Sequence, residues 1–209
     1  MTTKPALPRS RLTARGAATR ARIVEAAADL VYVRGVAGTS MDDVMQASAT
    51  SKSQLYHYFA DKEALVREVI TLQTERVLAA QQPHLRQLDS LAGLRRWRDV
   101  MIDLNRATGF GGCAIGSLSS ELADQSEPAR ELLAHSFQTW ETYIADGLQA
   151  IYDRGELAPG ADPRDLATAI MAALEGGLLL AQTTRSNRPL ELALDMALQH
   201  VTADIVGAP

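Results

Sequence analysis

The sequence predicts an all-α protein of about nine helices, with an N-terminal three-helix domain and a larger helical C-terminal domain. Apolar residues recur every three or four positions through most of the 209 residues, which is the period of amphipathic helices. Capping residues and prolines at the starts of these runs mark separate helices. The sequence has no period-two alternation typical of strands, no internal repeat and no low-complexity tract.

The composition is that of a soluble globular protein, with 46% apolar and 22% charged residues. One cysteine excludes an intramolecular disulfide, and four well-separated histidines lack metal-ligand spacing, so we expect no metal and no cofactor. The N-terminus has no apolar run of the secretory type. The longest apolar stretch, Leu166–Ala181, has 16 residues and contains Glu175, which is too short for a membrane span. We therefore expect a cytoplasmic protein without a membrane partner.

The net charge of −4 is unevenly distributed. Residues 1–60 contain eight Lys or Arg and four Asp or Glu, a net charge of +4, whereas residues 61–209 contain thirteen and twenty-one, a net charge of −8. Because attraction to phosphates is local, a basic N-terminal part with an acidic remainder favours a DNA reader with a separate regulatory domain. A chance distribution with a solvated basic tail is the alternative.

Residues 1–17 read as a basic flexible arm, because they contain prolines and a glycine but no acidic residue, with cations at Lys4, Arg9, Arg11 and Arg15. Such an arm suits a DNA minor groove or phosphate screening, and a tail without function has the same composition. From Thr19 the pattern becomes helical, with a C-terminal stop at Gly35 and an apolar face of Ile23, Ala27, Leu30 and Val31.

Two short helices follow with the spacing of a helix-turn-helix. Ser40 and Asp43 form a variant of the capping box and predict a helix over 41–47. A second helix over 51–58 places Leu55 and Phe59 on one face, where they can anchor it. Its other polar side chains then face outward. A short core helix with aromatic residues is the alternative, but Leu55 and Phe59 already serve the core.

The run S-K-S-Q-L-Y-H-Y-F-A-D-K-E, from Ser51 to Glu63, resembles the recognition helix of the TetR family of bacterial transcriptional repressors. The likeness covers residues 19 to about 70. It implies a helix-turn-helix DNA-binding domain over 18–64 and an effector-binding and dimerisation domain over 65–209. It also implies double-stranded operator DNA as a partner, contacted through Ser40, Thr50, Ser51, Lys52, Ser53, Gln54, Tyr56, His57 and Lys62.

The resemblance implies a role for each of these residues. Ser53 and Gln54 occupy the positions exposed to bases, and the amide of Gln54 suits adenine. Lys62 presents charge and a helix N-terminus to phosphate. Ala49 and Ser53 depart from the family, which has glycine at the first position and often at the second. An alanine at positive φ would cost on the order of 1 kcal/mol, so we expect a slightly different turn.

The rest of the chain predicts six further helices. Their expected positions are Asp61 to Pro83, about 90–108, about 113–124 after a Gly109–Gly112 break, Ser126 to about Arg154, Pro163 to about Arg185, and a last one with Leu190, Leu194, Val201 and Ile205.

The stretch Leu166–Ala181 must be buried on more than one side, because Glu175 is its only charge. We expect it to pack on the last helix and on a twofold mate, giving a homodimer through about 163–206 with Gly176 and Gly177 at close approach. A dimer doubles the short site that one recognition helix can read. A central core helix in a monomer is the alternative.

The C-terminal helices are expected to enclose a small-molecule effector, whose candidate lining is Trp97, Met101, Asn105, Phe110, Cys113, Phe137, Trp140, Met171 and Glu175. Each of these residues alone fits an ordinary core equally well. A largely apolar pocket suits a hydrophobic effector. Glu175 paired with His135 is a further alternative for this carboxylate.

Cys113 follows Gly111-Gly112 at the start of the sixth helix, and this start is similar to one found in a branch of the family in which some members sense electrophiles. A helix N-terminus lowers a thiol pKa, but we expect an inert buried thiol. We find no catalytic triad, phosphate loop or carboxylate pair, so we do not expect an enzyme. The expected function is a ligand-responsive transcriptional repressor; an activator or nucleoid-type protein without a ligand is the alternative.

Overall fold

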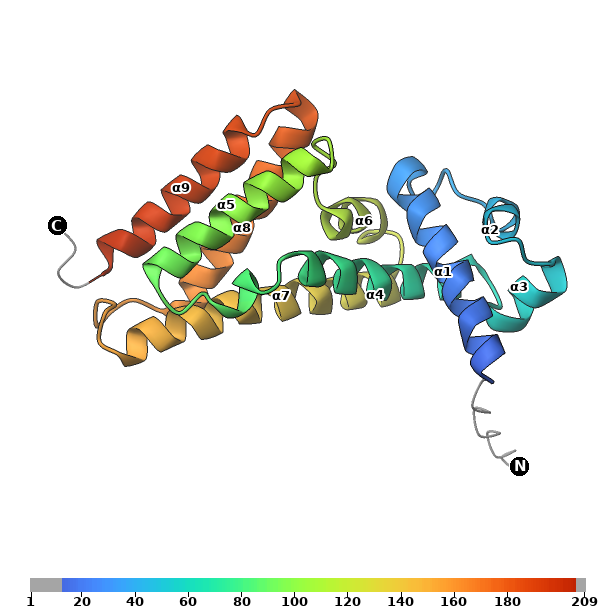
Figure 1. Ribbon diagram of the computed structural model, residues 1–209, viewed down its shortest axis with the longest axis horizontal. Helices are drawn as coiled ribbons and strands as arrows, with labels where there is room; N and C mark the ends of the chain where they lie inside the picture. The colour runs from blue at the N-terminus through green and yellow to red at the C-terminus, as the bar shows by residue number, and fades with distance from the viewer. Residues whose placement is uncertain (1–12, 206–209) are drawn as a thin grey trace. The chain divides into compact units, whose positions relative to one another are not determined.

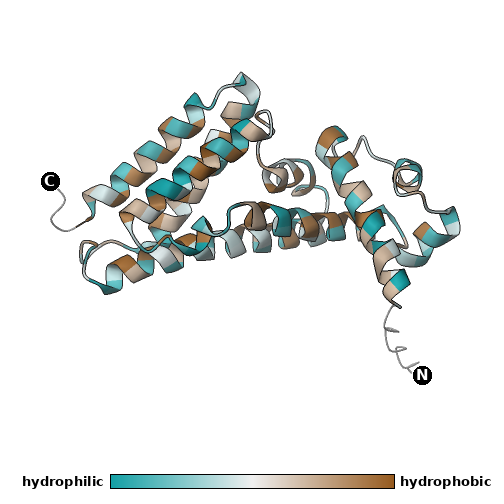
Figure 2. Ribbon diagram, viewed as in Figure 1, coloured by the Kyte–Doolittle hydropathy of each residue, from teal (hydrophilic) through white to brown (hydrophobic). Residues whose placement is uncertain are grey.

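The computed structural model describes residues 13–205, and this range contains nine α-helices, one short 3₁₀ turn and no named strand (Figure 1). The all-α prediction is confirmed. The chain divides into two compact units, one up to Val69 and the other from Ile70 onward. Apolar and polar residues both recur along the helices of the two units (Figure 2), as in amphipathic helices.

The first unit contains the three helices predicted for the N-terminal domain. They are α1 (Ala14–Arg34), α2 (Met41–Ala47) and α3 (Lys52–Tyr58), followed by the first turns of α4 (Lys62–Ala80). α1 packs on α2, and α2 packs on α3. The core of this unit consists of buried apolar side chains, among them Ile23, Ala27, Val44, Leu55, Phe59, Leu65 and Val69.

α1 begins at Ala14, five residues before the apolar pattern starts at Thr19. The hydroxyl of Thr13 accepts a hydrogen bond from the backbone N–H of Gly16 at 3.1 Å and so caps the helix. Residues 14–17, which we expected in the arm, are therefore helical. Residues 1–12 of the expected arm lie outside the described residues.

The boundary between the two compact units falls after Val69. Leu65, Val66 and Val69 are buried, and they line the same small space as Ala27 and Val44. The first two turns of α4 thus complete the core of the first unit. Because α4 continues through Ala80 without a break, the sequence contains no linker that would mark the boundary.

The second unit contains the rest of α4, the 3₁₀ turn and five helices. These are η1 (His84–Arg86), α5 (Leu91–Ala107), α6 (Ala114–Leu122), α7 (Glu127–Asp153), α8 (Pro163–Thr184) and α9 (Arg188–Ala203). α8 packs on both α7 and α9, α5 packs on α9, and α6 packs on α7. α8 is therefore the central helix of this unit.

We expected Ile205 in the last helix, and this prediction is wrong. α9 ends at Ala203, and Ile205 pairs with Leu157 in an isolated antiparallel bridge. The backbone N–H of Ala158 donates to the carbonyl of Asp204 at 2.5 Å. Leu157 is buried, so the chain after α9 pairs with the loop that precedes α8 instead of adding another helical turn.

One buried amide joins three helices of the second unit. The indole nitrogens of Trp97 and Trp140 both donate to Oε1 of Gln81, at 2.9 and 3.0 Å. The amide nitrogen of Gln81 donates to the carbonyl of Val77 at 2.8 Å. All three polar side chains are at most 1% exposed. Gln81 therefore satisfies two buried N–H groups that would otherwise lack an acceptor.

We predict that Gln81→Leu lowers the free energy of unfolding of the second unit by at least about 2 kcal/mol, because each orphaned indole N–H costs about 1–3 kcal/mol. Urea denaturation followed by circular dichroism measures this change. Gln87→Leu, which makes the same exchange at an exposed side chain, is the control and should have little effect. Equal stabilities of the two variants would contradict the role of Gln81.

Candidate nucleic-acid interface and effector site

Both short helices of the first unit begin with a capping box. In α2 the backbone N–H of Asp43 donates to the Ser40 hydroxyl at 3.1 Å, and the N–H of Ser40 donates to the Asp43 carboxylate at 2.9 Å, as predicted. The hydrogen bonds from Ser40, together with the charge of Arg34, lower the pKa of Asp43. α3 carries a second box, which we did not predict, between Ser51 and Gln54.

The second box commits part of the side chain expected to read bases. Oε1 of Gln54 accepts the backbone N–H of Ser51 at 3.0 Å, while the N–H of Gln54 donates to the Ser51 hydroxyl at 3.2 Å. A bidentate amide contact with adenine needs both the oxygen and the nitrogen of the amide. With the oxygen bound in the cap, Gln54 retains its two amide N–H donors for DNA.

The faces of α3 are divided as the sequence predicted. Leu55 and Phe59 are 1% and 2% exposed and anchor the helix. The side chains on its outer surface are exposed, namely Lys52, Ser53, Gln54, Tyr56 and His57. Within seven residues this face offers a cation, a hydroxyl, an amide, a phenol and an imidazole. Their contacts with DNA remain a prediction.

Two of the residues expected to contact DNA have partners inside the first unit. Thr50 is 8% exposed, and its hydroxyl lies 2.8 Å from that of Ser48. The ammonium of Lys62 donates to the carbonyl of Val36 at 2.5 Å and so ties α4 to the segment after α1. Because both polar groups are engaged in the fold, their expected contacts with DNA remain predictions that compete with structural roles.

The turn between α2 and α3 places Ala49 in the left-handed conformation, whose cost for an alanine had led us to expect a slightly different turn. Ala49 has a φ of 49°, a left-handed conformation that costs an L-residue roughly 1–2 kcal/mol. The backbone N–H of Ala49 donates to the carbonyl of Gln46 at 3.2 Å. The backbone N–H of Thr50 donates to the carbonyl of Met45 at 3.1 Å. The alanine thus adopts the conformation for which the family resemblance led us to expect glycine.

Arg20 has two partners inside the first unit. Its guanidinium lies 2.7 Å from the Glu68 carboxylate and 5.4 Å from the centroid of the Phe59 ring. Arg20 therefore connects α1 with the end of α3 and with α4. Only the fold brings residues so distant in the sequence together.

The expected effector residues fall into separate groups by their polar contacts. Trp97 and Trp140 share Gln81, while Asn105 donates to Asn187 at 2.7 Å. Cys113 and Glu175 contact each other. Of the remaining candidates, Met101 and Met171 are buried and Phe110 and Phe137 are half-buried.

The Cys113–Glu175 pair joins α6 to α8. Cys113 is the N-cap of α6, and its sulfur accepts the N–H of Gly116 at 3.4 Å. The thiol donates to the Glu175 carboxylate. A Cβ at Gly116 would lie 2.5 Å from Oε2 of Glu175, so this glycine lets the carboxylate approach the helix. His135, the alternative partner of Glu175, is exposed.

The surroundings of this pair disfavour a reactive thiolate. Burial and the adjacent carboxylate of Glu175 raise the pKa of Cys113 well above its usual range, which outweighs the effect of the helix N-terminus. Burial also raises the pKa of Glu175 to about 7. Its Oε1 is buried and receives no hydrogen bond from any residue in 13–205. These observations support the expectation of an inert Cys113.

Comparisons with known proteins cover most of the chain. Residues 23–69 match the family described as "Bacterial regulatory proteins, tetR family", and residues 90–197 match "Tetracyclin repressor-like, C-terminal domain". An uncharacterised HTH-type transcriptional regulator of Lactococcus lactis is 31% identical over 185 residues, covering 85% of this chain and 90% of its own.

Two further relatives agree. The HTH-type transcriptional repressor NemR of Escherichia coli is 27% identical over 184 residues, which cover 84% of this chain and 90% of NemR. A solved TetR transcriptional regulator from Chloroflexus aurantiacus superposes with a TM-score of 0.75 at 27% identity, covering 92% of this chain and 98% of that chain.

The structure suggests a pair of variants that separates the two functions of Gln54. Gln54→Glu keeps an oxygen for the cap but removes the amide donors, whereas Gln54→Ala removes both. We predict that both variants relax the preference at one base pair per half-site, by roughly 1–3 kcal/mol, in a binding assay with operator duplexes altered at single positions. Only Gln54→Ala should also lower the melting temperature. Unchanged base preference in Gln54→Glu would assign Gln54 to the cap alone.

The raised pKa of Glu175 predicts a pH dependence of stability. The native state holds this proton more tightly than the unfolded chain, whose carboxyl has its ordinary pKa of 4.5. The resulting stabilisation is full below that value and is lost as the pH rises through about 7. Between about pH 5 and pH 8 the free energy of unfolding should fall, and it should fall less in Glu175→Gln. Parallel pH profiles of the two proteins would contradict this prediction.

Proposed function

Since the chain belongs to the TetR family of bacterial transcriptional regulators, we propose that it is a repressor that binds a palindromic operator as a homodimer and is released by a small hydrophobic effector. The observation that carries the proposal is the outer face of α3, where a capped helix anchored by Leu55 and Phe59 exposes five polar or aromatic side chains. A helix in the major groove needs such a face.

Charge supports the location of the DNA contacts. The first 60 residues have a net charge of +4, and the following residues have a net charge of −8. Phosphate attraction therefore acts on the unit that contains α3. Repression, rather than activation, is proposed because the similar NemR is a repressor. A protein that acts on operator DNA works in the cytoplasm, and we propose no enzymatic activity.

An exposed apolar surface on α8 and α9 supports the homodimer. Leu179 and Leu180 on α8 are 61% and 54% exposed, and Leu192 and Met196 on α9 are 45% and 71% exposed. Exposed apolar side chains gathered on two packed helices are typical of a protein interface. A twofold mate that places its own α8 and α9 here would bury all four side chains in one isologous contact.

The effector is proposed to bind in the second unit and to shift the spacing of the two recognition helices. Such coupling typically amounts to ~1–3 kcal/mol. The buried apolar side chains of α5, α7 and α8 favour a hydrophobic ligand. Cys113 and Glu175 connect α6 with α8, so a ligand that displaces either helix would alter this contact.

We predict that Met196→Glu weakens the dimer, because it places a charge among the exposed apolar residues of α8 and α9. Analytical ultracentrifugation should give the mass of two chains for the wild-type protein and a shift towards the 22.6 kDa monomer for the variant. The variant should also lose affinity for palindromic DNA. Gln138→Glu, which adds the same charge at an exposed position of α7, serves as the control.

Selection from a random DNA library by the wild-type protein tests the proposal directly. The expected product is a palindrome bound with steep salt dependence. A monomeric wild-type protein would exclude the homodimer, and a selection that yields no preferred sequence would exclude operator recognition.

A further inference from the structure

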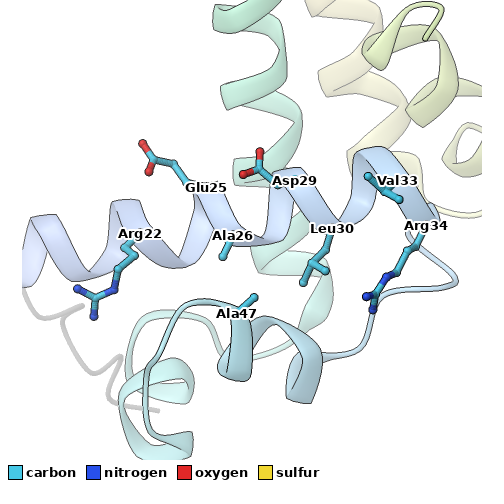
Figure 3. A pocket seen from close by; sticks show the side chains of 8 residues that line it. All are labelled: Arg22, Glu25, Ala26, Asp29, Leu30, Val33, Arg34 and Ala47. Atoms are coloured by element: carbon cyan, nitrogen blue, oxygen red, sulfur yellow. The ribbon is translucent and has the colours of Figure 1, made fainter. Parts of the chain in front are cut away.

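A side chain of α1, that of Arg22, stabilises the turn between α2 and α3. Arg22 extends from α1 towards the end of α2 that carries Ala47 (Figure 3). Its Nε donates to the carbonyl of Ser48 at 2.9 Å, across 26 positions of the sequence. Ser48 is the C-cap of α2 and directly precedes Ala49, the residue in the left-handed conformation. The guanidinium thus binds the carbonyl at the point where the chain changes direction.

Two physical effects make this contact stronger than an ordinary turn hydrogen bond. A donor that carries a full charge forms shorter and stronger hydrogen bonds than a neutral one. The C-terminus of a helix also bears partial negative charge, so a cation there is stabilised. Arg22 therefore favours the conformation in which Ser48 ends α2 and Ser51 begins α3, which the backbone of Ala49 disfavours.

The groove beside Arg22 is unsuited to a phosphate. This groove, of about 440 Å³ between α1 and α2, is lined by two cations and two anions, Arg22 and Arg34 with Glu25 and Asp29 (Figure 3). Its other lining residues are apolar. The guanidinium of Arg34 also lies 3.7 Å from the carboxylate of Asp43. A phosphate cradle would have an excess of positive charge, whereas these four charges cancel.

We infer that Arg22 is a positioning residue for DNA recognition, which holds the turn of the helix-turn-helix so that α3 presents its outer face in one orientation. The inference rests on the proposed function. Loss of the contact lets the turn sample other conformations. Sequence discrimination then falls because base contacts need a fixed helix, whereas attraction to phosphates does not depend on it.

Two variants of nearly equal length separate positioning from phosphate binding. Arg22→Gln places an amide N–H at the position of Nε and removes the charge, whereas Arg22→Met has similar reach and no donor. The probes are the palindrome selected by the wild-type protein and a scrambled duplex. Arg22→Met should reduce the ratio of their affinities about tenfold, within the range of one lost hydrogen bond. Arg22→Gln, which keeps a donor, should hold the ratio within about threefold of wild type. The salt slope should remain unchanged in both.

A second comparison uses the strain at Ala49. In an Ala49→Gly background the turn adopts its left-handed conformation without cost. Arg22→Met should therefore reduce the affinity ratio by less than about threefold in this background. Such a dependence of one substitution on another is expected of residues in contact or coupled through the backbone. An equal loss in both backgrounds would overturn the inference. So would a lower salt slope, by about one unit, in both Arg22 variants, because it would assign Arg22 to a phosphate.

Hydrogen exchange of the DNA-free protein distinguishes failure of this inference from failure of the proposed function. The amides of Ala49 and Thr50 donate within the turn, and their exchange should be faster in Arg22→Met than in Arg22→Gln or the wild-type protein. Unchanged exchange in Arg22→Met would show that the hydrogen bond from Arg22 to Ser48 does not stabilise the turn. If exchange is faster in Arg22→Met but the wild-type protein selects no DNA, the hydrogen bond from Arg22 still stabilises the turn. The failed selection would then exclude DNA recognition and, with it, the positioning role of Arg22.

Discussion

A seven-residue helix does not persist in water by itself, because the few hydrogen bonds it forms do not repay the cost of nucleation. α3 has this length, and the first unit is organised around stabilising it. Ser51 and Gln54 satisfy backbone groups at its start, while Leu55 and Phe59 bury its inner face. Its outer side chains are thereby left out of the core. The exposed polar face is thus a consequence of how the helix is held.

The same constraint explains why cations near the N-terminus have different roles. Arg20 contacts Glu68 and the ring of Phe59, and Arg22 binds the carbonyl of Ser48. Both residues stabilise the ends of short helices, where backbone groups or ring faces are available. Lys62 likewise binds the carbonyl of Val36. A count of positive charge in this unit therefore overestimates the charge that is free to attract phosphate, although the net charge still favours the approach of DNA.

The sequence predicts features that depend on near neighbours and fails where the fold brings distant residues together. The α2 cap and the buried positions of Leu55 and Phe59 follow from spacing within a few residues. The contact of Gln81 with Trp97 and Trp140 spans 16 and 59 positions, and no periodicity encodes it. The same limit applies to the candidate site, in which the buried and exposed faces of α3 were predicted but the partner of Lys62, the carbonyl of Val36 at 26 positions, was not.

α8 shows how one composition serves two kinds of burial. By length and composition alone, α8 could cross a membrane. Of its most apolar 18-residue stretch, 44% is buried within the chain. Its inner face packs on α7 and α9, and Leu179 and Leu180 remain exposed. A bilayer would also cover Gln182, which donates to the carbonyl of Gly111, and the carboxylate of Glu175, at a cost that apolar neighbours do not offset. A second protein surface needs to cover only the outer leucines. The apolar character of α8 is therefore better explained by a core on one side and, in the proposed homodimer, a partner chain on the other.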